Sequence, residues 1–427
     1  MKSPNQLSAV EAASAIEEGM LTSEALVRAC LDRIQERNAE VLAFTQVDTA
    51  FALRQARAAD HAPGAAWKSV LRGLPFAAKD VIDSADLITS YGSPIYAGHR
   101  PRIDAACVSL ARENGAVLLG KVATSEFATQ SPSTAKNPLN TAHTPGGSSS
   151  GSAVAVADFM VPVAFGTQTT ASIVRPASFC GIVGYKPTFG FIGTAGMKPL
   201  SPTQDTLGVL ARTVADAAFF TFGVHGTRVV AQPDLRPRLA ICRSRQWEAV
   251  RPEMAQAIER LAAKAERQGA KVTQIMLPDE LEDLIPLQMR LFAFEARQSL
   301  AVERQHHAAQ LTPRLRQRLE GGIGITVADY MDMRRRAAIA RHRIGALFAD
   351  VDALLYPPAQ GEADAGLHDS GSAQFGALWS LMHVPCVSVP MMTTGPQGLP
   401  MGVQVIGRYG DDEKVLAVAE FVSKVAH

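Results

Sequence analysis

A helix, a glycine and a short apolar strand follow one another in that order at two places in the sequence. Residues 104–114 have a helical pattern that ends at Gly115, and the apolar run 116–122 comes next. Residues 254–268 repeat the arrangement, with Gly269 and then the run 271–276. Glycine ends helices because it enters the left-handed conformation at no steric cost. Helices that alternate with buried strands are typical of α/β sheets, so the sequence predicts an α/β fold.

The rest of the chain is consistent with one domain. A simple division of the 427 residues by about 150 per domain would suggest three units. However, no repeat of fixed period and no low-complexity linker divides the chain. We therefore predict a single large domain over residues 1–427, with a mixed central β-sheet and helices on both faces. Within it we distinguish three regions: a helical N-terminal region (1–65), a core (73–216) and a second helical region (250–350).

Composition excludes several classes of protein. Hydrophobic residues make up 47% of the chain and charged residues 19%, below the ~25% of an average soluble protein. Global disorder is excluded because it needs low hydrophobicity and a high net charge. The formal net charge is only +1, so nucleic acid is not expected as the main partner.

The sequence predicts neither a cysteine-based framework, such as disulfides or a zinc ribbon, nor a membrane-spanning segment. The five cysteines are scattered and contain no Cys-x-x-Cys pair, which argues against a disulfide framework or a zinc ribbon. The start of the chain lacks the apolar core of a signal peptide. The most apolar stretch, 153–165, is interrupted by Asp158 and Pro162 and is too short to span a bilayer. We expect a cytoplasmic, soluble protein that makes no membrane contact and binds no metal.

Two polar segments lie beside predicted core strands. Residues 130–151 are rich in Ser, Thr, Gly and Pro, and residues 167–172 follow the predicted strand 161–166. Long loops inside compact domains are usually functional or disordered. Polar loops at the ends of buried strands are where α/β proteins place their sites. The two segments are therefore candidates for a functional site.

Short motifs in the first polar segment do not identify it. Residues 147–151 match G-x-S-x-G, but that nucleophile elbow follows a buried strand directly, and residues 137–145 show no strand pattern. A P-loop is excluded because Gly-Lys-Ser/Thr is absent. Residues 133–136 match the S-x-x-K of β-lactamases, yet no K-T-G exists. Taken alone, the segment is better explained as a Ser/Gly-rich helix cap and loop.

Lys79 stands at the end of the apolar run 74–78. Burying a charged lysine is costly, and burial favours the neutral amine, which can act as a base. Alternatively, Lys79 pairs with Asp80 or Asp83 at the end of a strand. The residue pattern alone leaves both interpretations open.

Together, eight segments resemble the amidase signature family. The resemblance covers nearly the whole chain and is densest from 73 to 216. No single motif is specific, but the combination is. It implies the α/β amidase fold, with 73–216 as the catalytic core and 250–350 on the substrate side. The matching segments are 73–80, 145–153, 166–172, 175–188, 205–208, 211–216, 385–390 and 398–404.

The family uses a Ser–cis-Ser–Lys triad. By motif position, the resemblance implies that Lys79 is the lysine, Ser148 the cis serine and Ser172 the nucleophile. A neutral Lys79 would take a proton from Ser148, which would take one from Ser172, so that Ser172 attacks an amide carbonyl. Water would then release the acyl-enzyme. The resemblance implies no metal and no organic cofactor.

The expected oxyanion hole departs from the family pattern. The resemblance assigns it to the backbone N–H groups around Thr169, Thr170 and Ala171. Most members carry Gly-Gly at the last two of these positions. Side chains there narrow the loop and remove the freedom to adopt positive φ. This departure predicts a different loop shape or reduced activity.

A second departure concerns an arginine. Most members carry Arg two residues after the nucleophile, whereas here that position is Val174 and Arg175 follows. This placement is similar to malonamidase-type members, which act on small amides that bear a carboxylate. Because a planar guanidinium suits bidentate pairing with a carboxylate, Arg175 is predicted to bind substrate, together with Gly147. The alternative is a structural ion pair of Arg175, for example with Asp205.

The resemblance implies hydrolysis of an amide carbon–nitrogen bond in a small, carboxylate-bearing substrate, with release of ammonia or an amine. One alternative is the glutaminase subunit of a tRNA-dependent amidotransferase, which needs a partner protein. Another is a weakly active or inactive binding protein built on the amidase fold. Dimers are common in the family, so a homodimer is a further expectation.

Overall fold

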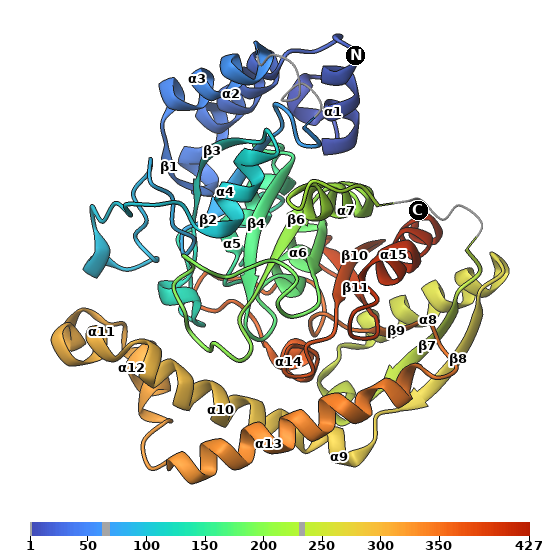
Figure 1. Ribbon diagram of the computed structural model, residues 1–427. Helices are drawn as coiled ribbons and strands as arrows, with labels where there is room; N and C mark the ends of the chain where they lie inside the picture. The colour runs from blue at the N-terminus through green and yellow to red at the C-terminus, as the bar shows by residue number, and fades with distance from the viewer. Residues whose placement is uncertain (1, 62–68, 230–234) are drawn as a thin grey trace.

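A computed structural model describes residues 2–61, 69–229 and 235–427 of the protein (Figure 1). Within these residues eleven strands form one mixed sheet, in the order β1-β3-β2-β4-β6-β5-β10-β11-β9-β7-β8. This confirms the predicted α/β fold. The strands are β1 (Phe44–Val47), β2 (Pro75–Lys79), β3 (Val117–Val122), β4 (Val163–Gln168), β5 (Val183–Lys186), β6 (Thr206–Ala211), β7 (Arg238–Arg243), β8 (Lys271–Met276), β9 (Ala353–Tyr356), β10 (Cys386–Thr394) and β11 (Pro400–Ile406).

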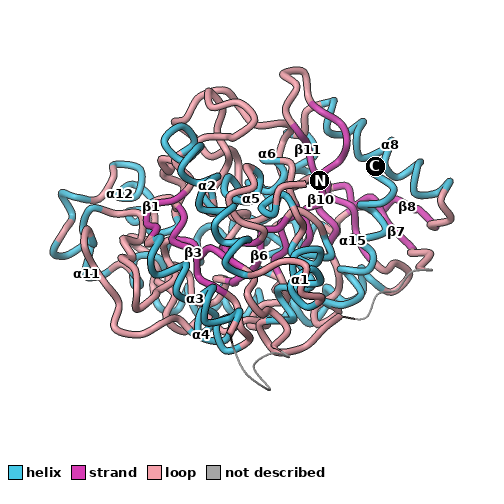
Figure 2. Tube along the Cα trace, turned by 90° about the horizontal axis from the view of Figure 1, so that it is seen from above, coloured by secondary structure: helices cyan, strands magenta, loops and turns pink. Residues whose placement is uncertain are grey.

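Helices lie on both sides of the strands, which cross the molecule as a band when seen from above (Figure 2). The long helix α13 runs along an outer edge next to α10 (Figure 1). No helix of the described ranges is long and apolar enough to cross a membrane. The helices are α1 (Ala9–Glu17), α2 (Ser23–Val41), α3 (Thr49–Asp60), α4 (Ala106–Glu113), α5 (Ser150–Ala157), α6 (Val174–Cys180), α7 (Val214–Gly223), α8 (Pro252–Arg267), α9 (Asp279–Glu282), α10 (Leu284–Ser299), α11 (Ala301–His306), α12 (Pro313–Glu320), α13 (Val327–Arg343), α14 (Gln374–Leu381) and α15 (Asp412–Ala426).

Both helix–glycine–strand units are present. Gly115 follows α4 with φ +88° and Gly269 follows α8 with φ +92°, and each leads into its strand. The N-terminal region contains the helices α1, α2 and α3 and also the strand β1, which was not predicted and pairs antiparallel with β3. Positions 1 and 62–65 of that region lie outside the described residues.

Sheet order determines where the polar segments meet. Strand β2 lies between β3 and β4 and is parallel to both, with Ala78 opposite Phe165. The carboxyl ends of parallel strands meet at one edge of a sheet, where α/β proteins bind their ligands. Lys79 ends β2 and Gln168 ends β4. The edge therefore brings Lys79 next to the second polar segment.

An aromatic cluster packs these two strands together. The ring of Phe76 in β2 lies 5.6 Å from that of Phe165 in β4, in an edge-on arrangement, and both rings contact Phe220 of α7. Aromatic pairs of this geometry add about 0.5–1.5 kcal/mol beyond the burial of their area. The cluster holds the strand pair that carries the candidate site.

Candidate active site

Lys79 is fully buried at the end of β2. Its Nζ lies 2.7 Å from Ser148 Oγ and donates a hydrogen bond to Thr167 Oγ1 at 2.8 Å. Burial holds the pKa of the Lys79 amine well below its usual range, and the charge of Asp205 opposes this only in part. The arrangement favours the neutral form of the amine, next to a serine hydroxyl.

The alternative pairing of Lys79 with Asp80 or Asp83 is wrong. Successive side chains of a strand point to opposite faces, so Asp80 points away from Lys79 and pairs with the buried Lys121 at 3.4 Å. Asp83 instead accepts a hydrogen bond from Tyr91 Oη at 2.8 Å.

Ser148 and Ser172 are brought together by their backbones. The Gly147–Ser148 peptide bond is cis, and Gly146 before it has φ +77°. The N–H of Ser149 donates to the carbonyl of Ser172 at 3.2 Å. Ser172 is partly exposed, whereas Ser148 is buried. The three residues implied as a triad therefore occupy one place at the edge of the sheet.

The loop 169–172 is braced across its ends. The side chain of Gln168 accepts hydrogen bonds from the N–H groups of Ile173 and Val174 at 2.8 and 3.1 Å. The same side chain donates to Ser380 Oγ, which donates to the carbonyl of Thr170 at 2.8 Å. Within the described part of the chain, the N–H groups of Thr170, Ala171 and Ser172 donate to no other residue. A fixed loop with free N–H groups next to a serine suits an oxyanion hole.

The side chains that replace the usual glycines fit without strain. Neither Thr170 nor Ala171 has a positive φ. Ala171 is buried against α14, where a Cβ on Gly376 would lie 2.8 Å from Ala171 Cβ and 2.3 Å from the carbonyl oxygen of Thr170. The absence of a side chain at Gly376 thus makes room for the one at Ala171.

We expect Gly376→Ala to displace the loop. The added methyl cannot fit at these distances, and overpacking of this kind costs about 1–3 kcal/mol of stability. If the loop is the oxyanion hole that the sequence predicts, the kcat of the variant should fall more than its KM rises, because an oxyanion hole acts on the transition state. Gly193→Ala is the control, since a Cβ there meets nothing within 4 Å. Equal kcat and KM in the two variants would show that packing against α14 does not determine the conformation of the loop.

Asp205 is a site residue that sequence reasoning assigned only as a partner for Arg175. It is buried and accepts from Thr169 Oγ1 at 2.5 Å and from the N–H groups of Leu200 and Ser201 at 2.8 and 2.9 Å. Burial raises the pKa of the Asp205 carboxyl. Asp205 fixes the start of the loop and does not pair with Arg175.

Arg175 lies inside the protein, with 1% of its surface exposed. Its guanidinium donates to the carbonyl oxygens of Gly147 and Gly371 and, at 3.3 Å, to Ser370 Oγ. Burial lowers its pKa to about 10. These contacts favour a role in holding the Gly147 carbonyl over bidentate pairing with a substrate carboxylate.

Two further arginines lie near Arg175, and sequence reasoning missed both. The charges of Arg314 and Arg318 in α12 contribute to the lowered pKa of Arg175. Arg314 pairs with Asp369 at 2.8 Å. Arg318 donates to Gln130 Oε1 and lies over the ring of Phe292 in α10, 5.2 Å from its centre, with no ion pair among the described residues. An arginine without an acidic partner can bind an anion.

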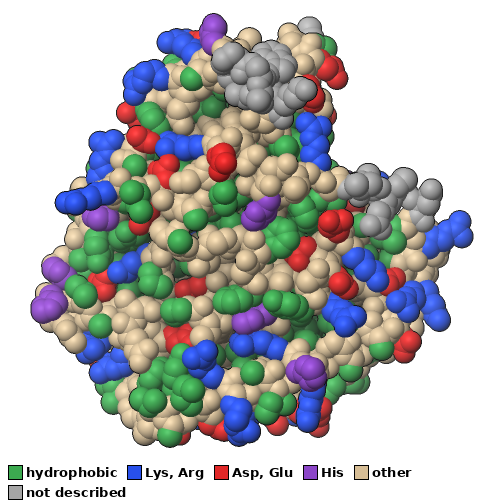
Figure 3. Space-filling model, in the orientation of Figure 1, with side chains coloured by type: hydrophobic (Ala, Val, Ile, Leu, Met, Phe, Trp, Pro, Cys, Tyr) green, Lys and Arg blue, Asp and Glu red, His purple; other side chains and the backbone are tan. Residues whose placement is uncertain are grey.

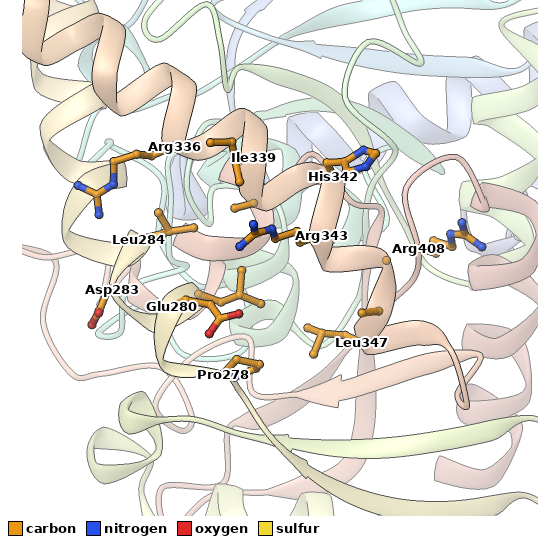
Figure 4. A pocket seen from close by; sticks show the side chains of 14 residues that line it. Pro278, Glu280, Asp283, Leu284, Arg336, Ile339, His342, Arg343, Leu347 and Arg408 are labelled. Carbon is orange, nitrogen blue, oxygen red and sulfur yellow. The ribbon is translucent and has the colours of Figure 1, made fainter.

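A large pocket lies apart from these residues. It has a volume of about 840 Å³ and lies between α9, α10 and the C-terminal part of α13, where Leu284, Ile339 and Arg343 line it (Figure 4). None of Lys79, Ser148 and Ser172 is among its lining residues. Over the described ranges, no group of three His, Cys, Asp or Glu side chains is placed to hold a metal ion.

Comparison with known proteins identifies the family. The model of the family described as Amidase matches residues 25–416. The chain is 31% identical over 473 aligned positions to the A subunit of the glutamyl-tRNA(Gln) amidotransferase of Roseiflexus castenholzii, covering 98% of this chain and 96% of the relative. The chain therefore belongs to the amidase signature family, and its class of activity is hydrolysis of a carbon–nitrogen bond.

Solved structures agree with this assignment. The native peptide amidase of Stenotrophomonas maltophilia superposes with a TM-score of 0.82 at 27% identity, covering 98% of this chain and 96% of that one. The inhibitor-bound form of a vestigial protein complex, studied for the origins of an s-triazine catabolic enzyme, superposes with a TM-score of 0.87 at 26% identity, covering 98% of both chains.

Proposed function

We propose that the protein hydrolyses the amide bond of a small, carboxylate-bearing substrate through an acyl-enzyme on Ser172. The observation that carries this proposal is the buried contact of 2.7 Å between Lys79 Nζ and Ser148 Oγ. The next residue, Ser149, donates its backbone N–H to the carbonyl of Ser172, so Ser148 lies close to Ser172. A neutral Lys79 takes the proton of Ser148, and Ser148 takes that of Ser172 as its Oγ attacks the carbonyl carbon.

The remaining steps use the loop and the same three side chains. The free N–H groups of the loop stabilise the negative charge that develops on the carbonyl oxygen. The proton held by Lys79 returns to the leaving nitrogen, which departs as ammonia or an amine. A water molecule, deprotonated by the same relay, then attacks the ester at Ser172 and releases the acid.

A screen for ammonia release tests this function. Malonamate-like, urea-derived, aliphatic and aryl amides are supplied to the wild type and to Ser172→Ala. We expect release from at least one carboxylate-bearing amide by the wild type alone. Equal release by the two proteins, or none from any amide, would contradict the proposal.

We further propose that Arg318, which has no ion pair among the described residues, binds the substrate carboxylate. We expect Arg318→Ala to raise KM about ten- to hundredfold for acidic amides, because a hydrogen bond between charged groups contributes about 1.5–3 kcal/mol. Neutral amides should change little. Arg316→Ala, an exposed position of the same helix, is the matched control. An equal rise in KM for acidic and neutral amides would show that Arg318 does not bind the substrate carboxylate.

A second candidate is the glutaminase component of a tRNA-dependent amidotransferase. The similarity to the A subunit of that enzyme favours it. So does the surface around α10, α12 and α13, because residues 284–348 contain eleven Arg, no Lys and only five Asp or Glu in a protein of net charge +1. In Figure 3, basic side chains lie along the lower edge of the molecule among hydrophobic side chains and some acidic ones. Such a surface suits an acidic partner or RNA.

Purification from the native source distinguishes the two candidates. The second predicts a stable complex with a different protein chain and glutamine-dependent amidation of charged tRNA. The first predicts amide hydrolysis by the isolated chain.

A further inference from the structure

Thr170 is held by a residue from a distant part of the chain. Gln288 of α10 is fully buried, and its Nε2 donates to Thr170 Oγ1 at 3.2 Å and to Gln204 Oε1 at 2.8 Å. Both hydrogen atoms of the amide are therefore used. Thr170 stands where most family members have glycine, so a residue without a side chain could not make this contact.

The direction of the hydrogen bonds is fixed by Glu295. Its carboxylate accepts from Ser201 Oγ at 2.5 Å and from Thr203 Oγ1 at 2.8 Å. Because the single proton of Ser201 goes to Glu295, Ser201 Oγ accepts from Gln204 Nε2 at 2.8 Å. Gln204 must then present its oxygen to Gln288, and Gln288 must present its nitrogen to both Gln204 and Thr170.

This network adds to the loop 169–172 a contact that the hydrogen bonds of Ser380 and Asp205 do not provide. Ser380 fixes the carbonyl of Thr170, and Asp205 fixes the hydroxyl of Thr169. Gln288 fixes the side chain of Thr170. Because both the backbone and the side chain of Thr170 are held, the N–H groups that follow it have a defined direction. The loop achieves this although it lacks the Gly-Gly that most family members carry at positions 170 and 171.

We propose that Gln288 is a positioning residue for the oxyanion loop, acting through the hydroxyl of Thr170. The proposal rests on the function proposed above. Its consequence is that the contact matters in the transition state, when the loop receives the oxyanion, and much less in substrate binding.

A double-mutant cycle tests the proposal. Gln288→Leu and Thr170→Val each remove one partner at similar volume, and each should lower kcat about five- to thirtyfold with KM within about twofold. The double variant should be no slower than Gln288→Leu, because that single variant already loses the contact with Thr170 together with the one to Gln204. Thr170→Ser keeps the acceptor and should recover most of the kcat that Thr170→Val loses. Gln298→Leu, exposed on the same helix, is the control.

Thermal unfolding and circular dichroism accompany the kinetics. Multiplicative losses in the double variant, or a Thr170→Ser variant as slow as Thr170→Val, would overturn the proposal. A fall in melting temperature with kcat unchanged would also overturn it, since that outcome describes a purely structural contact. If the wild type hydrolyses no amide, the proposed function fails instead, so the two failures are distinguishable.

Discussion

Replacing Ser172 with alanine is expected to lower the rate of amide hydrolysis by at least about 10⁴-fold while the fold is retained. Ser172 is the proposed nucleophile, and losses of this size accompany removal of a nucleophilic serine. Ser172 is partly exposed and no side-chain hydrogen bond to its Oγ is present among the described residues, so its removal leaves no buried group unpaired. The melting temperature should therefore change little.

The matched variant for this experiment is Ser148→Ala. Water can enter between Lys79 and Ser172 and carry the proton in place of Ser148, so a smaller loss of about 10²–10³-fold is expected. Rates of ammonia release, with circular dichroism to verify folding, establish the order. A folded Ser172→Ala protein with substantial activity would falsify the assignment of the nucleophile, whereas a Ser148→Ala protein as slow as Ser172→Ala would show that water does not replace the relay.

Replacing Lys79 with methionine is expected to remove nearly all activity and to change how stability depends on pH. The proposed general base is lost, and loss of a general base removes about 10²–10⁴-fold of rate. The buried amine has a pKa well below the usual 10.5, so between these two values the unfolded chain binds a proton that the folded protein does not. The free energy of unfolding of the wild type must then rise as the pH increases across this interval.

Methionine has no proton to bind, so this contribution is absent from the variant. The difference in stability between Lys79→Met and wild type should therefore move in favour of the wild type as the pH rises toward 10.5. Urea unfolding of both proteins at a series of pH values measures the difference. A constant difference would show that Lys79 titrates at the same pH in the folded and unfolded states. Arg28→Met, on the exposed face of α2, controls for the loss of a surface cation.

Activity should follow the same titration. The relay needs the neutral amine, so kcat/KM is expected to fall as the pH drops through the lowered pKa of Lys79. If the rate instead tracked a pKa near 10.5, Lys79 would be an ordinary solvated lysine, which its burial argues against.

Local patterns in the sequence predicted the α/β fold, because each depends on neighbouring residues. The glycines after α4 and α8 end those helices wherever the helices pack, and the apolar runs that follow form strands. The apolar run before Lys79 indicated a strand but left open whether the lysine is a buried base or pairs with Asp80 or Asp83. Strand β1 was missed because its four residues lie between two strong helical patterns. Strands β5, β6, β7 and β10 were not predicted either, since apolar strands buried on both faces cannot be told from buried helix by periodicity.

The tertiary structure decided which partners surround the proposed catalytic residues. Sequence patterns did not decide whether Lys79 is a base or a member of an ion pair. Because side chains alternate along β2, Asp80 points away from Lys79 and pairs with Lys121 instead. The motif position of Arg175 suggested a contact with substrate, and the fold directs it to the carbonyl of Gly147. Gly376 explains how the loop accepts Ala171, although nothing near either residue in the chain indicates the other.

By itself, the sequence determined the class of fold, the family and the positions implied for Lys79, Ser148 and Ser172. Only the tertiary structure revealed the contact of Gln288 in α10 with Thr170 and the position of Arg318 in α12 over Phe292, on which the roles proposed for them rest. The physical reason is distance along the chain: Gln288 contacts Thr170 across 118 positions. A contact of that range depends on how whole helices pack against the sheet, and residue patterns within a single helix do not encode it.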